Sequence, residues 1–308
     1  MLNGKKTVIV IPSYNVEKEI RKTIETLPDF VDYIIAVDDC SKDQTANVIS
    51  KIMDKRLFLI KNKINLGVGG ATVAGLVKGL ELGGDIFVKF DGDGQMDPNK
   101  MKDLISPLFA GFDYAKGNRF LNSPELKKMP LIRLLGNFAL TFLTKISSGY
   151  WKIFDPQNGY LAITKESLEC LPLERIYKRY FFENDMLINL NIIGAKVKDV
   201  EMAAIYGDEK SNLKISKILS SFPWLLFNRF FVRIYKKYLL RDFSVIGVFY
   251  LWGIFLMFFG TLFGSYHWIL SVNSGVPSTT GTVMIAVLPI ILGFQLFIEG
   301  IVLEVNEC

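Results

Sequence analysis

Two long apolar runs near the C-terminal end of the 308-residue chain constrain its fold most strongly. Residues 243–264 contain no charged side chain, and residues 282–303 contain only Glu299. At a rise of about 1.5 Å per residue, each run forms a helix of about 33 Å, enough to cross the hydrocarbon core of a bilayer. The alternative is a buried helical hairpin, but two such runs are too long and too apolar for the core of a chain of this size. The sequence therefore predicts two transmembrane spans, at about 243–264 and 282–303.

The charged residues around these spans predict their orientation. The connector, residues 265–281, has no Lys, Arg, Asp or Glu, whereas residues 210–241 contain eight basic residues and no acidic one. The positive-inside rule then places the N-terminal region and both termini in the cytoplasm. The rest of the chain has 28 Lys and Arg against 31 Asp and Glu. The net charge of +5 is therefore local, and it does not indicate nucleic-acid binding.

The basic segment also has the pattern of a helix that lies on a membrane surface. Arg229, Arg233 and Lys237 recur every four residues. A second stripe of large apolar side chains has the same spacing: Phe222, Leu226, Phe230, Ile234 and Tyr238. Such a helix places its cations at anionic headgroups and its apolar face among the acyl chains. We expect three regions: a domain at 1–210, basic amphipathic juxtamembrane helices at 211–241 and a transmembrane hairpin at 242–308.

Residues 1–210 alternate between strand patterns and helix patterns. Strands are expected near 7–11, 33–37, 57–60, 85–90, 160–163 and 196–202, and helices near 17–27, 43–53 and 69–82. Strands that alternate with helices predict an α/β fold with a mostly parallel, doubly wound sheet. Another amphipathic helix is expected at 126–148, and the sequence leaves open whether it belongs to the core or rests on the membrane.

Polar residues follow each of the first four predicted strands. These polar clusters are residues 12–15, 38–41, 65–70 and 91–95. The carboxyl ends of parallel strands meet at one edge of a sheet, where such folds bind their ligands. The chain has no GxxxxGK[ST], and its GVGG segment is not GxGxxG, so a P-loop and a dinucleotide fold are disfavoured. Together the four clusters indicate a nucleotide site.

The turn Asp91-Gly92-Asp93 places two carboxylates close together at the end of a strand. Two close carboxylates repel each other unless a cation lies between them. Mg²⁺ or Mn²⁺ suits this position, because such ions take one or two carboxylates together with substrate phosphates. A solvated acidic turn is the simpler alternative, but this turn lies at the same sheet edge as Asp38 and Asp39.

Several motifs together resemble family 2 glycosyltransferases, which have the GT-A fold. The motifs are IPSYNVEKEI, VDDCSKDQT, NLGVGGA, DGDGQMDP and FFEND. With KGNRF, DPQNGY, the YGDE segment and the C-terminal hairpin, the chain resembles the polyprenyl-phosphate glycosyltransferases of the dolichol-phosphate mannose synthase-like group. The resemblance implies a metal-dependent, inverting transfer of a hexose-type sugar from a nucleotide-sugar to undecaprenyl or dolichyl phosphate, at the cytoplasmic face of the membrane.

The resemblance also implies roles for individual residues. The nucleotide-sugar would be bound by Pro12, Tyr14, Glu17, Asp39, Asn65, Gly67 and Asp91. The metal, Mg²⁺ or Mn²⁺, would be held by Asp91, Asp93 and Gln95, and the acceptor phosphate by Arg119, Arg133 and Asn137. The catalytic residues would be Asp93, Glu183 and Asp185. Asp185 could instead cap a helix. It could also position substrate without abstracting a proton, because a lipid phosphate is already anionic and needs no base.

The resemblance leaves several points open. A processive polysaccharide synthase is one rival function, although the chain has no QxxRW and only two apolar runs. A catalytically inactive membrane scaffold is another. A UDP-sugar is slightly favoured over GDP-mannose as the donor, and the sequence does not decide whether the chain is a homo-oligomer.

Overall fold

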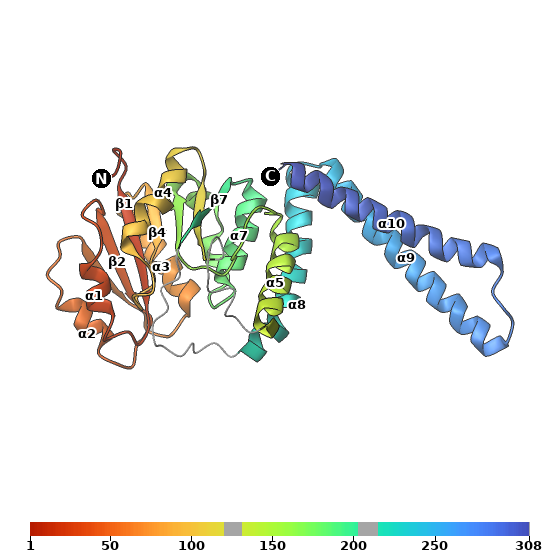
Figure 1. Ribbon diagram of the computed structural model, residues 1–308, viewed down its shortest axis with the longest axis horizontal. Coiled ribbons are helices and arrows are strands. Elements are labelled where there is room, and N and C mark those ends of the chain that lie inside the picture. Colours follow the sequence, from red (N-terminus) through yellow and green to blue (C-terminus); the bar gives the residue numbers. More distant parts are fainter. Residues whose placement is uncertain (120–130, 203–214, 308) are drawn as a thin grey trace. The chain divides into compact units, whose positions relative to one another are not determined.

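The computed structural model describes residues 1–119, 131–202 and 215–307 (Figure 1). The chain divides into two compact units, Met1–Arg229 and Phe230–Cys308. The first unit is built on a seven-stranded sheet, and the second contains two long apolar helices.

The sheet has the strand order β3-β2-β1-β4-β6-β5-β7. Its strands are β1 (Thr7–Ser13), β2 (Tyr33–Asp38), β3 (Leu57–Lys61), β4 (Ile86–Lys89), β5 (Tyr114–Asn118), β6 (Leu161–Thr164) and β7 (Val197–Glu201). Strand β6 runs antiparallel to both of its neighbours, β4 and β5, and the other neighbouring pairs are parallel. The mostly parallel sheet expected from the sequence is therefore confirmed.

Strand β5 was not among the strands expected from the sequence. Its residues, YAKGN, combine a Lys, a Gly and an Asn, and they lack the apolar alternation of a half-buried strand. All five are nevertheless buried. The Lys116 side chain is accommodated because its ammonium donates to the backbone carbonyls of Phe154 and Asp155. The strand depends on partners that are distant in the sequence.

Helices cover both faces of the sheet. One face packs against α3 (Val68–Glu81), α6 (Lys165–Cys170) and α7 (Phe182–Ile193), and the other against α1 (Ile20–Glu25), α2 (Thr45–Ser50) and α4 (Met101–Phe109). Glycine lets α3 lie close to β1, since a Cβ at Gly75 would be 2.3 Å from Val10 Cγ1. This close packing fixes the N-terminus of α3 at the carboxyl edge of the sheet.

Two further helices of the first unit expose apolar side chains. Helix α5 (Leu131–Ser148) buries Thr144 and Ser147 but exposes Phe138, Phe142 and Leu143. Helix α8 (Ile215–Arg233) exposes Trp224 and Phe227. The sequence left open whether the helix at 126–148 belongs to the core. Phe138, Phe142 and Leu143 are exposed, so these three side chains are not part of the core.

The structure does not support the predicted exposure of the apolar stripe on the basic segment. Phe222, Leu226, Phe230, Ile234 and Tyr238 are all buried within the protein. Two cations of the basic stripe have internal partners, because Arg229 pairs with Asp185, and Arg233 with Glu304. The segment is helical, as predicted, but partners distant in the sequence bury this stripe, and the exposed side chains of the segment include Trp224, Phe227 and Tyr235.

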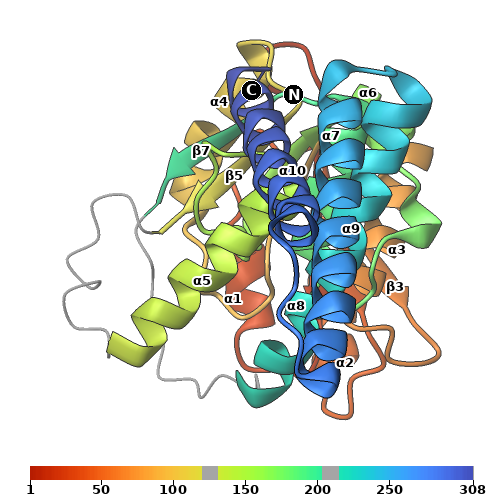
Figure 2. The ribbon, with the colours of Figure 1, turned by 90° about the vertical axis from the view of Figure 1, so that its right-hand side faces the viewer.

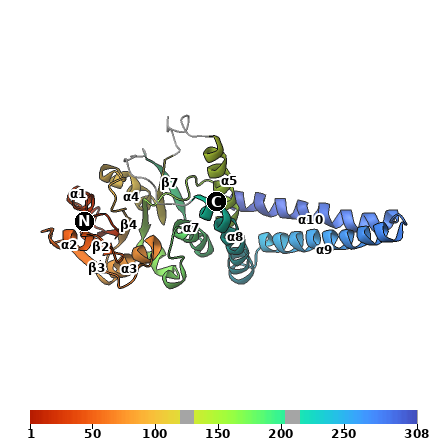
Figure 3. The same ribbon diagram turned by 90° about the horizontal axis from the view of Figure 1, so that it is seen from below.

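The C-terminal hairpin consists of α9 (Val245–Ser274) and α10 (Thr280–Glu307), which run side by side (Figure 2, Figure 3). Both are long and apolar enough to cross a membrane, and only 28% and 11% of their most apolar stretches are buried in the protein. This exposure argues against the alternative of a buried core hairpin. Helix α9 is longer than the predicted span, because nothing charged interrupts it until Gly275, which ends it with a φ of 67°.

A buried ion pair lies inside the second unit. Arg233 and Glu304 are almost completely buried and paired, and Glu304 also accepts a hydrogen bond of 2.6 Å from the Tyr238 hydroxyl. Glu304→Gln would leave Arg233 buried without this countercharge, so we expect the free energy of unfolding to fall by about 3–5 kcal/mol. Thermal unfolding in detergent would measure the change. Glu299→Gln, an exposed residue of the same helix, is the control, and equal melting temperatures for the two variants would contradict the prediction.

Candidate active site

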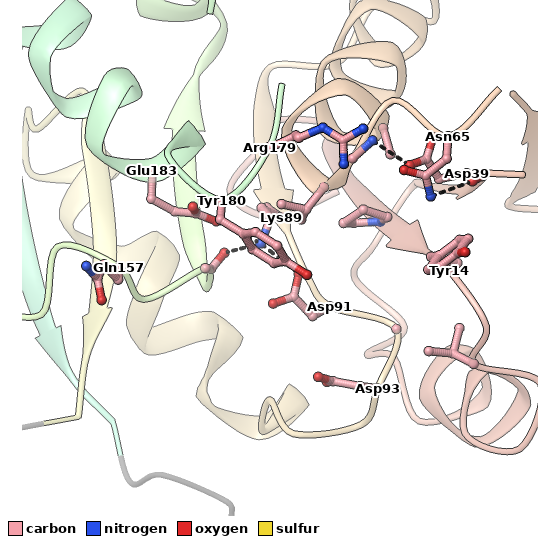
Figure 4. Close-up of a pocket in the computed structure, with 18 of the residues that line it drawn as sticks. Tyr14, Asp39, Asn65, Lys89, Asp91, Asp93, Gln157, Arg179, Tyr180 and Glu183 are labelled. Atoms are coloured by element: carbon pink, nitrogen blue, oxygen red, sulfur yellow. Dashed lines mark hydrogen bonds and ion pairs between the residues drawn. The ribbon is translucent and has the colours of Figure 1, made fainter. Parts of the chain in front are cut away.

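A pocket of about 620 Å³ opens at the carboxyl edge of the sheet in the first unit (Figure 4). All four polar clusters predicted from the sequence contribute to it. Its walls are completed by segments much later in the chain: Gln157, Gly159, Arg179, Tyr180, Glu183 and Phe222. The volume is that of a pocket for a small-molecule ligand.

Asp39 organises one end of this pocket. Its carboxylate is buried and accepts hydrogen bonds from Asn62 Nδ2 at 2.8 Å, from Leu66 N at 2.9 Å and from Gly67 N at 2.7 Å. A carboxylate offers about four acceptor positions, so this arrangement leaves one for a ligand N–H or O–H. The structure brings Asp39 together with five other predicted nucleotide-sugar residues: Pro12, Tyr14, Asn65, Gly67 and Asp91.

Glu17 does not line the pocket. Its carboxylate accepts the backbone N–H of Gln44 at 2.8 Å, and its own backbone N–H donates to Asp43 at 3.2 Å. Glu17 therefore joins the loop after β1 to the start of α2. It supports the pocket wall from behind, in place of the ligand contact that the resemblance implied.

The acidic turn lies on another wall of the pocket, where Asp91 and Asp93 are both partly exposed. Gln95 lies outside: its side chain is exposed, and its backbone N–H donates to Asp93 Oδ1 at 3.1 Å. Among the described residues, no three His, Cys, Asp or Glu side chains gather as a metal cluster. Two carboxylates beside an open pocket nevertheless fit a hard divalent cation that takes its other ligands from substrate phosphates and water.

Lys89 is a pocket residue that the sequence reasoning missed. It is 1% exposed, and its ammonium lies 2.7 Å from Asp91 Oδ1 and 3.5 Å from Glu183 Oε1. Burial disfavours its charge, but the two carboxylates outweigh burial and raise the pKa of Lys89 above its ordinary value. A lysine within the apolar strand IFVK was the available signal, because a buried cation requires acidic partners.

The two acids of the FFEND motif have different environments. Glu183 lines the pocket, and burial raises its pKa, an effect that Lys89 partly offsets. Asp185 is 0% exposed and does not line the pocket. It accepts hydrogen bonds from Tyr177 N at 2.8 Å and from Arg229 Nε at 2.8 Å. The structure therefore places only Glu183 where it can contact a ligand. The alternative of a helix cap is also wrong, because α7 has no side-chain cap.

Of the three predicted acceptor-phosphate residues, the structure describes the side chain of Arg119 alone, and it lies outside the lining of the pocket. Arg119 is 41% exposed, and it contacts Asp155 through Nε at 2.7 Å and Nη2 at 2.9 Å. Burial alone would raise the pKa of Asp155, but the hydrogen bonds from Arg119 hold it below its ordinary value. Arg133 and Asn137 belong to α5, and their side chains lie outside the described residues.

The loop of residues 177–180 closes the pocket on the side of α3. It packs on glycines, since a Cβ at Gly67 would lie 2.8 Å from Lys178 O, and one at Gly69 would lie 2.5 Å from Tyr177 O. Gly70 N also donates to Lys178 O at 2.9 Å. This contact explains the glycines of NLGVGGA and directs Arg179 and Tyr180 to the pocket (Figure 4).

The sheet order and a ligand pocket with an acidic turn at its carboxyl edge define a glycosyltransferase of the GT-A fold. The chain belongs to glycosyl transferase family 2, whose family model matches residues 8–172. It is 35% identical to a UDP-N-acetylglucosamine–dolichyl-phosphate N-acetylglucosaminyltransferase of Methanococcus voltae, over 66% of this chain and 86% of the relative. It is 26% identical to an undecaprenyl-phosphate mannosyltransferase of Micrococcus luteus, over 65% and 84%.

Solved structures share the fold of this chain. Glucosyl-3-phosphoglycerate synthase from Mycobacterium tuberculosis, crystallised with Mn²⁺, UDP and its glucosylated product, superimposes with a TM-score of 0.55. The match covers 75% of this chain and 80% of that one at 19% sequence identity. At this identity the similarity establishes the GT-A architecture.

Proposed function

We propose that this glycosyltransferase moves N-acetylglucosamine from UDP-N-acetylglucosamine to a polyprenyl phosphate. The observation that carries the proposal is the pocket itself, in which Asp39 lies at one end and the Asp91-Gly92-Asp93 turn on another wall. The Methanococcus voltae relative, named for this donor and for a dolichyl-phosphate acceptor, supports the choice over GDP-mannose. The other relatives include mannosyltransferases at 26–28% identity, so GDP-mannose is the alternative donor to test.

The proposed reaction is a single displacement at the anomeric carbon. The lipid phosphate attacks as an anion, the bond from the sugar to the nucleoside diphosphate breaks, and the anomeric configuration inverts. Asp39 has one acceptor position for the nucleoside, and Glu183 reaches the pocket beside Lys89. Asp91 and Asp93 would hold Mg²⁺ or Mn²⁺, which supplies positive charge to the leaving diphosphate.

The lipid acceptor is supported by the apolar surface of the same unit. Helix α8 contributes Phe222 to the pocket and exposes Trp224 and Phe227, and α5 exposes Phe138 and Phe142. Aromatic side chains of this kind favour the boundary between headgroups and acyl chains. We propose that the hairpin of α9 and α10 anchors the protein in the cell membrane, with the catalytic unit and both termini in the cytoplasm.

Incubation of the purified protein with labelled donors tests the proposal. UDP-N-acetylglucosamine, UDP-glucose and GDP-mannose would each be supplied with undecaprenyl or dolichyl phosphate and Mg²⁺ or Mn²⁺. The expected result is a monosaccharide-lipid that partitions into organic solvent, with UDP-N-acetylglucosamine as the preferred donor. A water-soluble polymer would instead indicate a polysaccharide synthase. Failure to bind any nucleotide-sugar in the presence of metal would indicate an inactive scaffold.

A further inference from the structure

The buried carboxylate of Asp185 joins three segments of the first unit. It lies in the first turn of α7, two residues after Glu183. It accepts the backbone N–H of Tyr177 at 2.8 Å and the side-chain amide of Asn189 at 3.3 Å. Arg229 of α8 contacts both of its oxygens, with Nε at 2.8 Å and Nη2 at 3.0 Å. Asp185 thus links the loop before α7, α7 itself and α8.

The loop held by Tyr177 N reaches the pocket immediately afterwards in the chain. Arg179 and Tyr180 line the pocket, and the backbone between them and Tyr177 rests on Gly67, Gly69 and Gly70. Those glycines begin α3 and receive the support of Asp39 through Gly67 N. The position of this loop therefore determines where the cation Arg179 lies relative to Asp39 at one end of the pocket.

Helix α8 also packs on Phe181, the residue that follows this loop. Phe222 of α8 contacts Phe181 edge-to-face, with ring centroids 5.3 Å apart, and Phe222 also lines the pocket. Arg229 lies two helical turns further along α8, where its charge compensates that of Asp185. A fully buried carboxylate requires such a partner, because an uncompensated buried charge is strongly destabilising.

We infer that Asp185 and Arg229 are positioning residues that hold the 177–180 loop in place for the nucleotide-sugar, with Arg179 as the donor-binding cation that they position. The inference rests on the proposed function. It assigns Asp185 to donor affinity and removes it from proton transfer, since it does not line the pocket and both of its oxygens are engaged. A guanidinium suits the phosphates of a nucleoside diphosphate because its planar fork can donate two hydrogen bonds to them.

The test compares Asp185→Asn, Arg229→Gln and Arg229→Lys with wild type, using the full-length protein in detergent. Titration calorimetry with UDP and Mn²⁺ gives the Kd for the nucleotide, and donor kinetics give KM and kcat separately. We expect Asp185→Asn and Arg229→Gln to raise Kd and KM about tenfold, with kcat within about threefold of wild type. Arg229→Lys keeps the charge and should recover part of the affinity. Lys236→Gln, an exposed cation further along the chain, is the matched control.

Arg179→Ala tests the same inference if the Asp185 and Arg229 variants fold poorly. Arg179 is exposed, so its removal should not affect unfolding, yet it should raise Kd and KM by a similar factor. A fall in kcat of Asp185→Asn by 10²–10⁴-fold with Kd unchanged would identify a general base and overturn the inference. Unchanged Kd and KM in all four variants would also overturn it. If wild type binds none of the nucleotides UDP, GDP or their sugars, the proposed function itself fails, and that result is distinct from the variant outcomes.

Discussion

The double variant Asp91→Asn and Asp93→Asn is expected to lose sugar transfer almost completely and to remain folded. Both side chains line the pocket and are partly exposed, so their replacement by isosteric amides costs little packing. Buried Lys89 loses the charge of Asp91 but keeps that of Glu183 at 3.5 Å, so the variant should be less stable than wild type and still folded. The change removes two negative charges that would hold the divalent cation for the leaving diphosphate. Loss of electrostatic stabilisation at a reaction centre typically costs about 10²–10³-fold in rate for a single donor, and two lost ligands should cost at least as much.

Two measurements check this expectation. Transfer of labelled sugar to the lipid gives the rate, and thermal unfolding without nucleotide gives the stability of the fold. Asp103→Asn is the matched control, because Asp103 is an exposed acid away from the pocket. Among the ion pairs of the described residues, its one partner is the surface cation Lys100, at 2.9 Å. Full activity of the double variant, or full activity of wild type after removal of metal by a chelator, would contradict the mechanism.

Lys89→Met is expected to be the most destabilising single change in the pocket. It removes the ammonium that lies between Asp91 and Glu183 and retains the length of the side chain. Loss of one partner from a buried ionic cluster costs about 3–5 kcal/mol, because the remaining charge is left uncompensated. We also expect transfer activity to fall, since Asp91 and Glu183 both lose the contact that orients them.

The loss of stability in Lys89→Met should depend on pH, and the pKa of Glu183 determines the direction of this dependence. Burial raises the pKa of Glu183 above its ordinary value of 4.5. A carboxyl with a raised pKa in the folded protein stabilises the fold most below its ordinary pKa, and this contribution is lost as pH rises through the folded pKa. Lys89 opposes that loss in wild type. The deficit of Lys89→Met should therefore be larger at pH 8 than at pH 5.

Chemical denaturation at the two pH values measures this difference. Lys78→Met is the control, because Lys78 forms an exposed pair with Glu81 on α3, and such pairs contribute within about 1 kcal/mol. If Lys89→Met and Lys78→Met lower the free energy of unfolding equally, or if the Lys89→Met deficit does not change with pH, the assigned role of Lys89 is wrong.

Local patterns were sufficient to predict the elements that the chain forms by itself. The alternation of apolar strands with amphipathic helices predicted the mostly parallel sheet. The polar clusters after the first four strands predicted residues that line the pocket. These predictions succeed because parallel strands must end at a common edge, whatever the rest of the chain does. The strand β5 was missed, because its burial depends on partners around Asp155 and in β7.

The membrane-proximal charge shows where local patterns were insufficient. The sequence determined that eight cations precede the first apolar run, and that two runs are long enough to span a bilayer. Only the tertiary structure decided that Arg229 pairs with Asp185 and Arg233 with Glu304, and that the apolar stripe of the same segment is buried. It likewise decided that Glu183 lies in the pocket and Asp185 behind it. Periodicity specifies which residues share a helix face, but the partner of that face comes from distant parts of the chain.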